Sequence, residues 1–429
     1  MDKFVVRGGN PLLGTIKVSG AKNSALPCMA AAILTEDEVI LEKIPQVRDI
    51  ETERKLLSSM GAEVDLGYGR AQHRTRIRCA VLSDPVAKYE IVKTMRASSL
   101  VLGPLIARTG IARVAMPGGC AIGGRPIDLH IKGLEAMGAT ITQEHGYLEA
   151  RTDRLKGAHI VFDKITVTGT EDLLMAATLA EGETVFENCA REPEVTDLAA
   201  LLIAMGAKIE GAGTGTIHVQ GVSKLHGARH RINPDRIEAG TFLIAGAITG
   251  GDLNVDCCEP KHLGAVISKL EQCGVKLDVG ADNIRVRSGG AAGSLKASDI
   301  STEEYPGFPT DMQAQFMALA TQAEGTTTVT ENIFENRFMH VQELIRMGAN
   351  ITVAGRTATV RGKTPLQSAA VMCSDLRASA SLVLAALVAD GETILDRVYH
   401  LDRGYEHFEE KLRGVGAQIR RMGDVFGKR

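Results

Sequence analysis

The sequence predicts an α/β protein of two domains, built from six repeated units whose helices lie inside and whose sheets lie outside. Three observations lead to this prediction. A short motif, L-x-x-M-G-A-x-[IV] with variations, recurs six times along the 429 residues. A strongly apolar helix precedes each copy, and residues that favour a strand follow it. Repetition at this period indicates a copied supersecondary unit, and 44% apolar residues can form substantial cores in a chain of this length.

The repeated motif ends a helix and starts a strand. Its copies read LSSMGAEV, LEAMGATI, LIAMGAKI, LEQCGVKL, LIRMGANI and LRGVGAQI. Glycine after the last helical turn is the usual C-terminal cap, and the β-branched residues after it favour a strand. The motif glycines are Gly61, Gly138, Gly206, Gly274, Gly348 and Gly416.

Each unit is expected to hold two helices of different character. The first is apolar nearly all round, as in SALPCMAAAIL and SLVLAALVA, which indicates a buried helix. The second carries charge on one face, as in DIETERKLLSSM and YEHFEEKL, which indicates a helix at a surface. A turn and a strand follow each first helix, and a hairpin such as AKIEGAGTGTIHVQG precedes the next unit. The turn positions are Asp37, Gly110, Gly182, Gly250, Gly325 and Gly391.

The six units divide into two groups of three. A polar, basic segment, SKLHGARHRINPDR at 223–236, separates the third unit from the fourth. We therefore expect one domain at 22–230 and a second made of 1–21 and 231–429, with the active site in the cleft between them. The segments FVVRGG and GTIKVSG near the N-terminus would complete the second domain. His226 and His230 have the spacing of metal ligands, but no acidic general base accompanies them, so we interpret this segment as a solvated linker.

Polar residues begin the buried helices, about fourteen residues before each turn position. Asparagine, threonine and aspartate are common N-caps. A cation is not expected there, because it opposes the positive end of the helix dipole by about 0.3–1 kcal/mol at exposed sites. A bound anion would reverse this balance, so the sequence predicts a ligand with several negative charges. The residues are Asn23, which follows Lys22, and Arg96, Thr168, Arg236, Asp311 and Arg377.

Cations also stand about thirteen residues before the motif glycines, near the expected starts of the second helices. Surface charge is a sufficient explanation for Arg48 and Lys261. Arg125 and Arg403 lie in the contexts GGRPID and DRGYEH, and they are better candidates for binding a ligand. Arg337 stands two places further on in its unit.

Cys120 lies in an insertion. From turn position to motif glycine, the successive units span 24, 28, 24, 24, 23 and 25 residues. The extra length of the second unit falls at PGGCAIGG. A glycine-rich loop of this kind indicates a lid that closes over a site. Arg125 nearby favours the thiolate form of Cys120, and a merely exposed thiol is the alternative.

Composition argues against several classes of protein. The formal net charge of −3 argues against nucleic-acid binding by general electrostatics. The start MDKFVVRGGN lacks the apolar run of a signal peptide, and no segment reaches transmembrane length without a charge or a breaker. Eight cysteines without a CxxC pair indicate reduced thiols and a cytoplasmic protein. Cys28, Cys273 and Cys373 are expected in the core.

Six long motifs lie across both predicted domains: SGAKNSALP, KTMRAS, PGGCAIGGRPIDLH, EEYPGFPTDMQAQF, SDLRASASLVLA and LDRGYEHFEEKL. Together they resemble the UDP-N-acetylglucosamine 1-carboxyvinyltransferases of the EPSP synthase superfamily, and the resemblance runs along essentially the whole chain. It implies a two-domain inside-out α/β barrel with three repeats in each domain. It also implies transfer of enolpyruvyl from phosphoenolpyruvate to the 3′-hydroxyl of UDP-N-acetylglucosamine with release of phosphate, the first committed step of peptidoglycan synthesis. No metal or organic cofactor is expected.

The resemblance also implies roles for individual residues. Cys120 matches the general acid, which can also form a covalent adduct with phosphoenolpyruvate. Asp311 matches the residue that meets the sugar hydroxyl and is our choice for the base. Lys22 and Arg403 match contacts to phosphoenolpyruvate, as does Arg125, which also faces the nucleotide.

Further residues match contacts elsewhere in the site. Asn23 would bind near the sugar or stabilise the intermediate, and Arg337 and Arg377 would complete the site in a closed form. Leu100 stands where some relatives are expected to carry an aromatic residue, which concerns the lining of the cleft. The remaining matches to the nucleotide sugar are Arg96, Arg125, Pro126, Ile127, Asp128, Leu129, His130, Lys164, Ile165, Thr166, Val167 and Ile333.

Three alternatives stay open on the sequence alone. Transfer of enolpyruvyl to shikimate 3-phosphate would use the same fold but has no need of a cysteine lid. A relative that binds UDP-sugars without converting them would not need Cys120 and Asp311. A thiol redox enzyme would need a resolving cysteine near Cys120, and none is obvious. We expect a monomer with no nucleic-acid or membrane partner.

Overall fold

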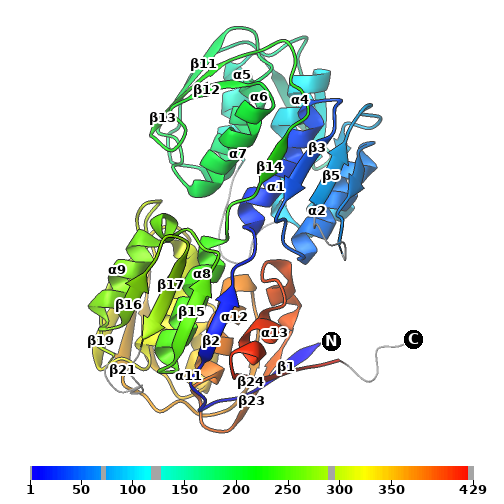
Figure 1. Ribbon diagram of the computed structural model, residues 1–429. Helices are drawn as coiled ribbons and strands as arrows, with labels where there is room; N and C mark the ends of the chain where they lie inside the picture. Colours follow the sequence, from blue (N-terminus) through cyan, green and yellow to red (C-terminus); the bar gives the residue numbers. More distant parts are fainter. Residues whose placement is uncertain (1, 69–73, 117–126, 288–294, 424–429) are drawn as a thin grey trace. The chain divides into compact units, whose positions relative to one another are not determined.

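The computed structural model describes residues 2–68, 74–116, 127–287 and 295–423. These residues form two compact units. The terminal unit comprises residues 2–19 and 234–423, and the central unit comprises residues 20–116 and 127–233. Within the described ranges the chain passes from one unit to the other at Ser19–Gly20 and at Asn233–Pro234 (Figure 1).

The central unit contains, in its described residues, three four-stranded sheets with one shared pattern. A short first strand pairs in parallel with a second strand, and a hairpin completes the sheet with antiparallel pairs. The sequence does not predict the short first strand of each unit, because two or three residues carry no periodic signal. In sheet order the strands are β14 (Arg229–Arg231), β3 (Val39–Glu42), β5 (Arg74–Arg78) and β4 (Glu63–Asp65); β6 (Val86–Ala87), β7 (Ile111–Ala115), β9 (Tyr147–Arg151) and β8 (Thr140–Glu144); and β10 (His159–Val161), β11 (Glu183–Glu187), β13 (Thr216–Gln220) and β12 (Lys208–Glu210).

The terminal unit repeats this pattern in its described residues, and the N-terminal strands complete two of its sheets. β2 (Leu13–Lys17) takes the place of the short parallel strand beside β15 (Asp252–Asp256). β1 (Lys3–Arg7) lies between β23 (Glu392–Asp396) and β24 (Gln418–Met422), where the other sheets have the second strand of their hairpin. The remaining strands are β17 (Asn283–Arg287) and β16 (Lys276–Val279) in the first sheet, β18 (Ile300–Ser301), β19 (Gly325–Thr330), β21 (Thr357–Gly362) and β20 (Asn350–Ala354) in the second, and β22 (Ala370–Met372) in the third.

The apolar helices are buried inside the units, as the sequence predicted. In the terminal unit α8, α10 and α12 contact one another, and each also packs on a different sheet. All residues of α10 are buried, and so is every residue of α8 after its first. The α/β fold with inner helices and outer sheets is therefore confirmed (Figure 1). The inner helices are α1 (Lys22–Ala31), α4 (Leu102–Thr109) after η2 (Arg96–Val101), α6 (Val167–Ala177), α8 (Arg236–Ile248), α10 (Gln313–Ala320) after η4 (Thr310–Met312), and α12 (Leu376–Ala386).

The second helices end as the repeated motif requires. The six motif glycines have φ between 83° and 107°, the left-handed region that glycine adopts at low cost after a helix. None of the helices in the described ranges is long and apolar enough to span a membrane. The second helices of the six units are α2 (Arg48–Ser59), α5 (Asp128–Ala136), α7 (Pro193–Ala204), α9 (Gly264–Gln272) after η3 (Pro260–Leu263), α11 (Val341–Arg346), and α13 (Phe408–Gly414) after η5 (Val398–Arg403). The short helices η1 (Ala32–Leu34) and α3 (Tyr89–Val92) complete the helices described.

The charged face of α2 lies at the surface, as the sequence predicted, with Arg48 and Lys55 exposed, although its inner face buries Asp49 and Glu53. α7 packs against the inner helix α1 and is largely buried. One expectation about the second helices was wrong, because Arg403 does not begin a helix. It ends η5, and α13 begins only at Phe408, because Gly404 breaks the helical backbone. Arg337 lies in a turn before α11.

The segment at 223–236 is more ordered than a solvated linker. Its residues Arg229–Arg231 form β14 against β3, and His230 pairs with a buried carboxylate of α7. Cys28, Cys273 and Cys373 are buried, as predicted. Leu100 is also buried, at 2% exposure, so it belongs to the core and does not line a cleft.

Candidate active site

Asp311 lies between two arginines of the terminal unit. Its Oδ1 accepts a hydrogen bond from Arg337 Nη2 at 2.8 Å, and its Oδ2 accepts from Arg377 Nε at 3.1 Å and Nη2 at 2.9 Å. The two arginine side chains are 4% and 5% exposed, whereas the Asp311 side chain is 26% exposed. Three residues chosen from the sequence are thus in direct contact, with the carboxylate on the side that solvent can reach.

Tyr405 and its hydrogen-bonded neighbours also lie beside Arg377. Its guanidinium lies 5.4 Å from the ring centroid of Tyr405. The Tyr405 hydroxyl is 2.9 Å from Thr241 Oγ1 and accepts a hydrogen bond from Gln315 Nε2 at 3.3 Å. Burial opposes the charge of Arg377, but the Asp311 carboxylate raises the pKa of Arg377 above its usual range. Burial also raises the pKa of Tyr405, so a cation and a neutral phenol face each other here.

The arginine pair keeps unused hydrogen-bond donors. Nη1 of Arg337 and Nη1 of Arg377 are buried, and neither has a hydrogen-bond partner among the described residues. A buried donor without a partner costs about 1–3 kcal/mol, so holding both cations behind Asp311 opposes the stability of this unit. His340 adds no charge at neutral pH, because burial lowers its pKa to about 4.

Glu331 is an anchor for this cluster that the sequence analysis missed. The side chain is 1% exposed. It accepts hydrogen bonds from the hydroxyls of Thr302 and Thr310, each at 2.9 Å. It also accepts from the backbone N–H groups of Ile333 at 2.9 Å and Phe334 at 3.1 Å. One buried carboxylate therefore ties the residue before Asp311 to the segment that carries Ile333. A glutamate before an apolar turn gives no sequence signal for such a role.

Lys22 has an internal partner in the central unit. It begins α1, and its Nζ lies 3.0 Å from Asp49 Oδ2, with side chains 12% and 5% exposed. Glu53 lies one turn further along α2 and is buried. Burial, and after it the charge of Asp49, raises the pKa of Glu53 to about 8. At neutral pH Glu53 is therefore a neutral acid, so it adds no charge beside the ion pair of Lys22 and Asp49.

The other candidates of the central unit are distributed over three segments. Asn23 follows Lys22 at the start of α1, and Arg96 begins η2. Ile127 precedes α5, whose first residues are Asp128, Leu129 and His130; of these, His130 is 2% exposed. The segment Lys164, Ile165, Thr166 and Val167 leads into α6, where the Thr166 hydroxyl accepts from Gly169 N at 3.2 Å. Cys120, Arg125 and Pro126 lie outside the described residues.

Arg403 ends η5 in the terminal unit, beside a strongly held carboxylate. Its neighbour Asp402 accepts hydrogen bonds from Arg421 Nη1 at 3.0 Å and Nη2 at 2.6 Å. Arg421, on β24, also donates to Glu409 of α13 through Nε at 2.6 Å and to Asp2 through Nη1 at 3.3 Å. Although burial opposes its charge, the carboxylates of Asp402 and Glu409 raise the pKa of Arg421. This network fixes the segment that carries Arg403, and no local sequence pattern predicts it.

The inner helices differ in how their N-termini are capped. Asp235 caps α8, and Asp375 caps α12, each accepting from two backbone N–H groups. Among the described residues no side chain caps α1, which begins at Lys22. Free N–H groups and the helix dipole make such an end attractive to an anion. Of these starts, α1 therefore best fits the anion site that the sequence predicted.

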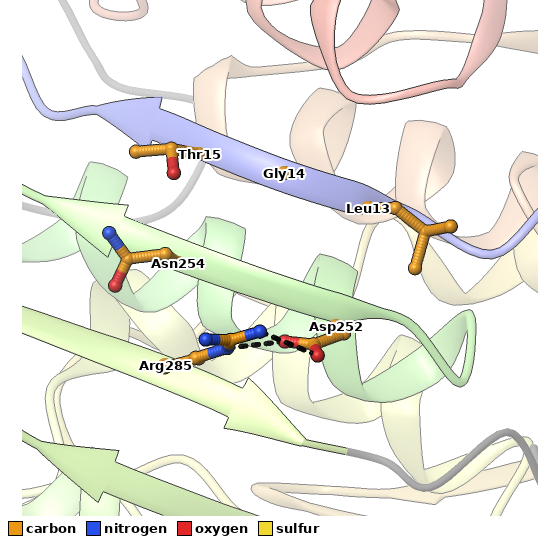
Figure 2. Close-up of a pocket in the computed structure, with 6 residues that line it drawn as sticks. All are labelled: Leu13, Gly14, Thr15, Asp252, Asn254 and Arg285. Carbon is orange, nitrogen blue, oxygen red and sulfur yellow. Dashed lines mark hydrogen bonds and ion pairs between the residues drawn. The ribbon is translucent and has the colours of Figure 1, made fainter.

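Two other features lie apart from the predicted site residues. A hollow of about 370 Å³ on the sheet of β2, β15 and β17 is lined by Leu13, Gly14, Thr15, Asp252, Asn254 and Arg285 (Figure 2). Arg285 and Asp252 pair there at 2.6 Å and 2.8 Å, so the hollow already satisfies its own charges. Cys28, Asp197 and His230 are the one group of metal-ligating side chains found within the described ranges.

The geometry can perform proton transfer and anion binding. A partly exposed carboxylate held by two cations can orient a hydroxyl group and accept its proton. Fixed cations and spare N–H donors can stabilise carboxylate and phosphate groups.

Comparison with known proteins gives the family. The sequence model of EPSP synthase (3-phosphoshikimate 1-carboxyvinyltransferase) matches residues 6–412. A UDP-N-acetylglucosamine 1-carboxyvinyltransferase from Acidobacterium capsulatum is 82% identical over 99% of this chain and 97% of its own. The protein of the same name from Koribacter versatilis is 73% identical over 100% of this chain and 98% of its own.

Solved structures agree on the fold. The enolpyruvyl transferase NikO from Streptomyces tendae matches with a TM-score of 0.87 and 25% identity, over 98% of this chain and 99% of its own. EPSP synthase from Acinetobacter baumannii matches with a TM-score of 0.74 and 21% identity, over 99% of this chain and 100% of its own. The resemblance drawn from the sequence motifs is confirmed, and the chain belongs to the EPSP synthase family and, within it, to the UDP-N-acetylglucosamine 1-carboxyvinyltransferases.

Proposed function

We infer that this protein transfers the enolpyruvyl group of phosphoenolpyruvate to the 3′-hydroxyl of UDP-N-acetylglucosamine and releases phosphate, the first committed step of peptidoglycan synthesis. The observation that carries this inference is the 82% identity, over nearly the full chain, to a protein named for that reaction. The cluster of Asp311, Arg337 and Arg377 supports it, because the reaction needs a base beside fixed cations.

We propose that the reaction proceeds by addition and elimination. Cys120 donates a proton to C3 of phosphoenolpyruvate while the sugar 3′-oxygen attacks C2 and gives its proton to Asp311. The product of this step is a tetrahedral intermediate that carries the phosphate on C2. The Cys120 thiolate then takes a proton back from C3, the C2–O bond to phosphate breaks with its electron pair leaving on the phosphate, and the enolpyruvyl ether forms. One proton is gained and one lost at C3, so no redox cofactor is needed.

Asp311 is suited to the role of base because its position is fixed. Both carboxylate oxygens already accept hydrogen bonds from guanidinium groups. Oδ2 accepts twice from Arg377 and Oδ1 accepts from Arg337, while the side chain remains about one quarter exposed. A sugar hydroxyl can therefore reach the exposed edge of the carboxylate.

We assign the anionic groups of the substrates to the basic residues of both units. Lys22, Arg125 and Arg403 would hold the carboxylate and phosphate of phosphoenolpyruvate. Asn23 would contact the sugar or the intermediate. Arg337 and Arg377 would complete the site when substrate is bound. The contacts to the nucleotide sugar would come from Arg96, from 125–130 and 164–167, and from Ile333.

The nearest rival is the sister reaction with shikimate 3-phosphate, since the matching family model bears that name. Phosphate release is measured with phosphoenolpyruvate and each acceptor in turn. We expect turnover with UDP-N-acetylglucosamine and none with shikimate 3-phosphate. Turnover with shikimate 3-phosphate alone would overturn the proposal, and absence of turnover with either would favour a binding protein without catalysis.

We further propose that the protein acts as a cytoplasmic monomer and that the two units are domains of three repeats each. Light scattering of the purified protein checks the first part. A dimer at micromolar concentration would contradict it.

A further inference from the structure

Three side chains with metal-ligating atoms meet in the central unit. Cys28 is on α1, Asp197 on α7 and His230 on β14. The Cys28 sulfur, a ring nitrogen of His230 and a carboxylate oxygen of Asp197 all lie within 4.8 Å of one another. Cys28 is fully buried, and the Asp197 and His230 side chains are 3% and 14% exposed. The group is thus a buried cluster with one edge near solvent, at His230.

The carboxylate of this cluster is oriented by its surroundings. Asp197 Oδ1 lies 2.8 Å from His230 Nε2, and Oδ2 accepts a hydrogen bond from the backbone N–H of Asn233 at 3.0 Å. Carboxylates that bind metals are commonly held in this way by a further hydrogen bond. Because Oδ2 is occupied by Asn233, Oδ1 faces the imidazole of His230, where both could bind the same metal ion.

We propose that Cys28, Asp197 and His230 bind one divalent cation of borderline softness, such as Zn²⁺ or Co²⁺. One sulfur, one nitrogen and one oxygen ligand suit these ions, whereas Mg²⁺ and Ca²⁺ prefer oxygen ligands throughout. The ligand atoms of a tetrahedral site lie roughly 3–4 Å apart, given metal–ligand bonds of about 2.0–2.3 Å. The three ligand atoms here lie within 4.8 Å of one another, so small side-chain rotations would bring them into that range.

The charges of the bound form balance. A thiolate and a carboxylate together carry two negative charges, and neutral imidazole carries none. A divalent cation therefore makes the buried site neutral, which avoids the large cost of an unpaired charge in the core. Binding releases the Cys28 proton and replaces the hydrogen bond between His230 and Asp197 with two metal bonds. Water at the exposed edge supplies the fourth ligand.

Such a site would connect three elements of the central unit. α1 carries Lys22 at its first residue, and β14 is the last strand before the chain leaves this unit at Asn233–Pro234. A cation at Cys28 would hold α1, α7 and β14 together without contacting substrate. The inference therefore stands whether or not the proposed reaction is correct.

The test is a titration of the chelator-treated, full-length protein with Co²⁺. We expect one equivalent to bind, with a sulfur-to-cobalt charge-transfer band in the near ultraviolet. Cys28→Ser should abolish this band. Cys189→Ser is the matched control, since Cys189 is a buried cysteine of the same unit outside the cluster, and it should keep the band.

A second variant guards against misfolding of Cys28→Ser. His230→Asn should weaken Co²⁺ binding by at least about tenfold, and circular dichroism checks that it is folded. Failure of the wild-type protein to bind Co²⁺ would overturn the proposal. So would a charge-transfer band that survives in Cys28→Ser, because another thiol would then be the ligand.

Discussion

Arg377 donates two hydrogen bonds to a single oxygen of Asp311, from Nε at 3.1 Å and from Nη2 at 2.9 Å, while Arg337 holds the other oxygen at 2.8 Å. A carboxylate that accepts hydrogen bonds at both oxygens cannot rotate freely. It presents its exposed edge in a fixed direction, as a positioned general base does. The two arginines stay charged whether or not Asp311 has accepted a proton.

Replacing this carboxylate should stop catalysis without unfolding the protein. Asp311→Asn keeps one acceptor oxygen for the arginines but removes the base. We expect kcat to fall by about 10²–10⁴-fold, measured by phosphate release, with an unchanged circular dichroism spectrum. Asp278→Asn is the control, because Asp278 is an exposed aspartate of the same unit paired with Arg287, and its activity should match wild type. A normal kcat for the Asp311→Asn variant would show that Asp311 is not the base.

Glu331→Ala should loosen the attachment between Asp311 and the Ile333 segment. Two threonine hydroxyls and two backbone N–H groups lose their acceptor, and each buried donor left without a partner costs about 1–3 kcal/mol. We expect a higher KM for UDP-N-acetylglucosamine and a lower Tm by calorimetry. The conservative variant Glu331→Gln should recover part of both. Equal KM values in all three proteins would show that this anchor does not bear on the sugar site.

Arg421→Lys should act on phosphoenolpyruvate through Arg403. Lysine cannot bridge Asp402 and Glu409 with paired hydrogen bonds as the guanidinium does, so the end of η5 will shift. Misplacement of a positioning group by about 1 Å can lower the rate on the order of 10²-fold. We therefore expect a large fall in kcat/KM for phosphoenolpyruvate and only a small change in KM for the nucleotide sugar. Arg420→Lys is the neighbouring control. Arg420 has an exposed side chain and one long contact to Glu392 at 3.5 Å, so its kinetics should not change. Matching losses in both variants would refute a specific role for Arg421.

Stability should depend on pH through Glu53. The pKa of this buried acid is raised from 4.5 in the unfolded chain to about 8 in the folded protein. Between these values the folded protein holds a proton that the unfolded chain has lost, so stability decreases as pH rises through this window. Glu53→Gln removes the dependence and should be the more stable protein at pH 8.5, by on the order of 4 kcal/mol.

The matched control for this prediction is Glu51→Gln on the same helix. Glu51 is partly exposed, and its hydrogen bond to Arg54 lowers its pKa, so this variant should not gain stability at high pH. Calorimetric unfolding at pH 5.5 and 8.5 measures all three proteins. Parallel pH profiles for wild type and Glu53→Gln would mean that Glu53 is ionised in the folded state.

The sequence could predict the repeated elements but not the contacts between them. The motif glycines and the apolar helices predict the repeated helix–strand unit, because helix capping and helix burial both leave local patterns in the sequence. The helix starts at Lys22, Arg96 and Arg377 were found to within one residue for the same reason. Their carboxylate partners were not. Asp49 stands 27 residues from Lys22 and Asp311 stands 66 from Arg377, and pairs so distant in the chain follow only from the fold.

Buried polar residues explain the remaining errors. Glu53, Glu331 and Asp197 resemble ordinary surface residues in the sequence, because a charged side chain is usually exposed. Each is nevertheless in the core of its unit. Glu331 and Asp197 accept hydrogen bonds there from neighbouring segments, and burial keeps Glu53 protonated. Arg403 was expected at a helix start from spacing alone, and Gly404 breaks that regularity.

The most direct test of the account is the mass of the product formed from phosphoenolpyruvate and UDP-N-acetylglucosamine in D₂O. Addition and elimination put a solvent-derived hydron on C3 before one of the three methyl hydrons leaves. The account predicts an enolpyruvyl ether of UDP-N-acetylglucosamine with deuterium in its methylene group, together with free phosphate. A product with an unlabelled methylene group, or no enolpyruvyl ether at all, would contradict it.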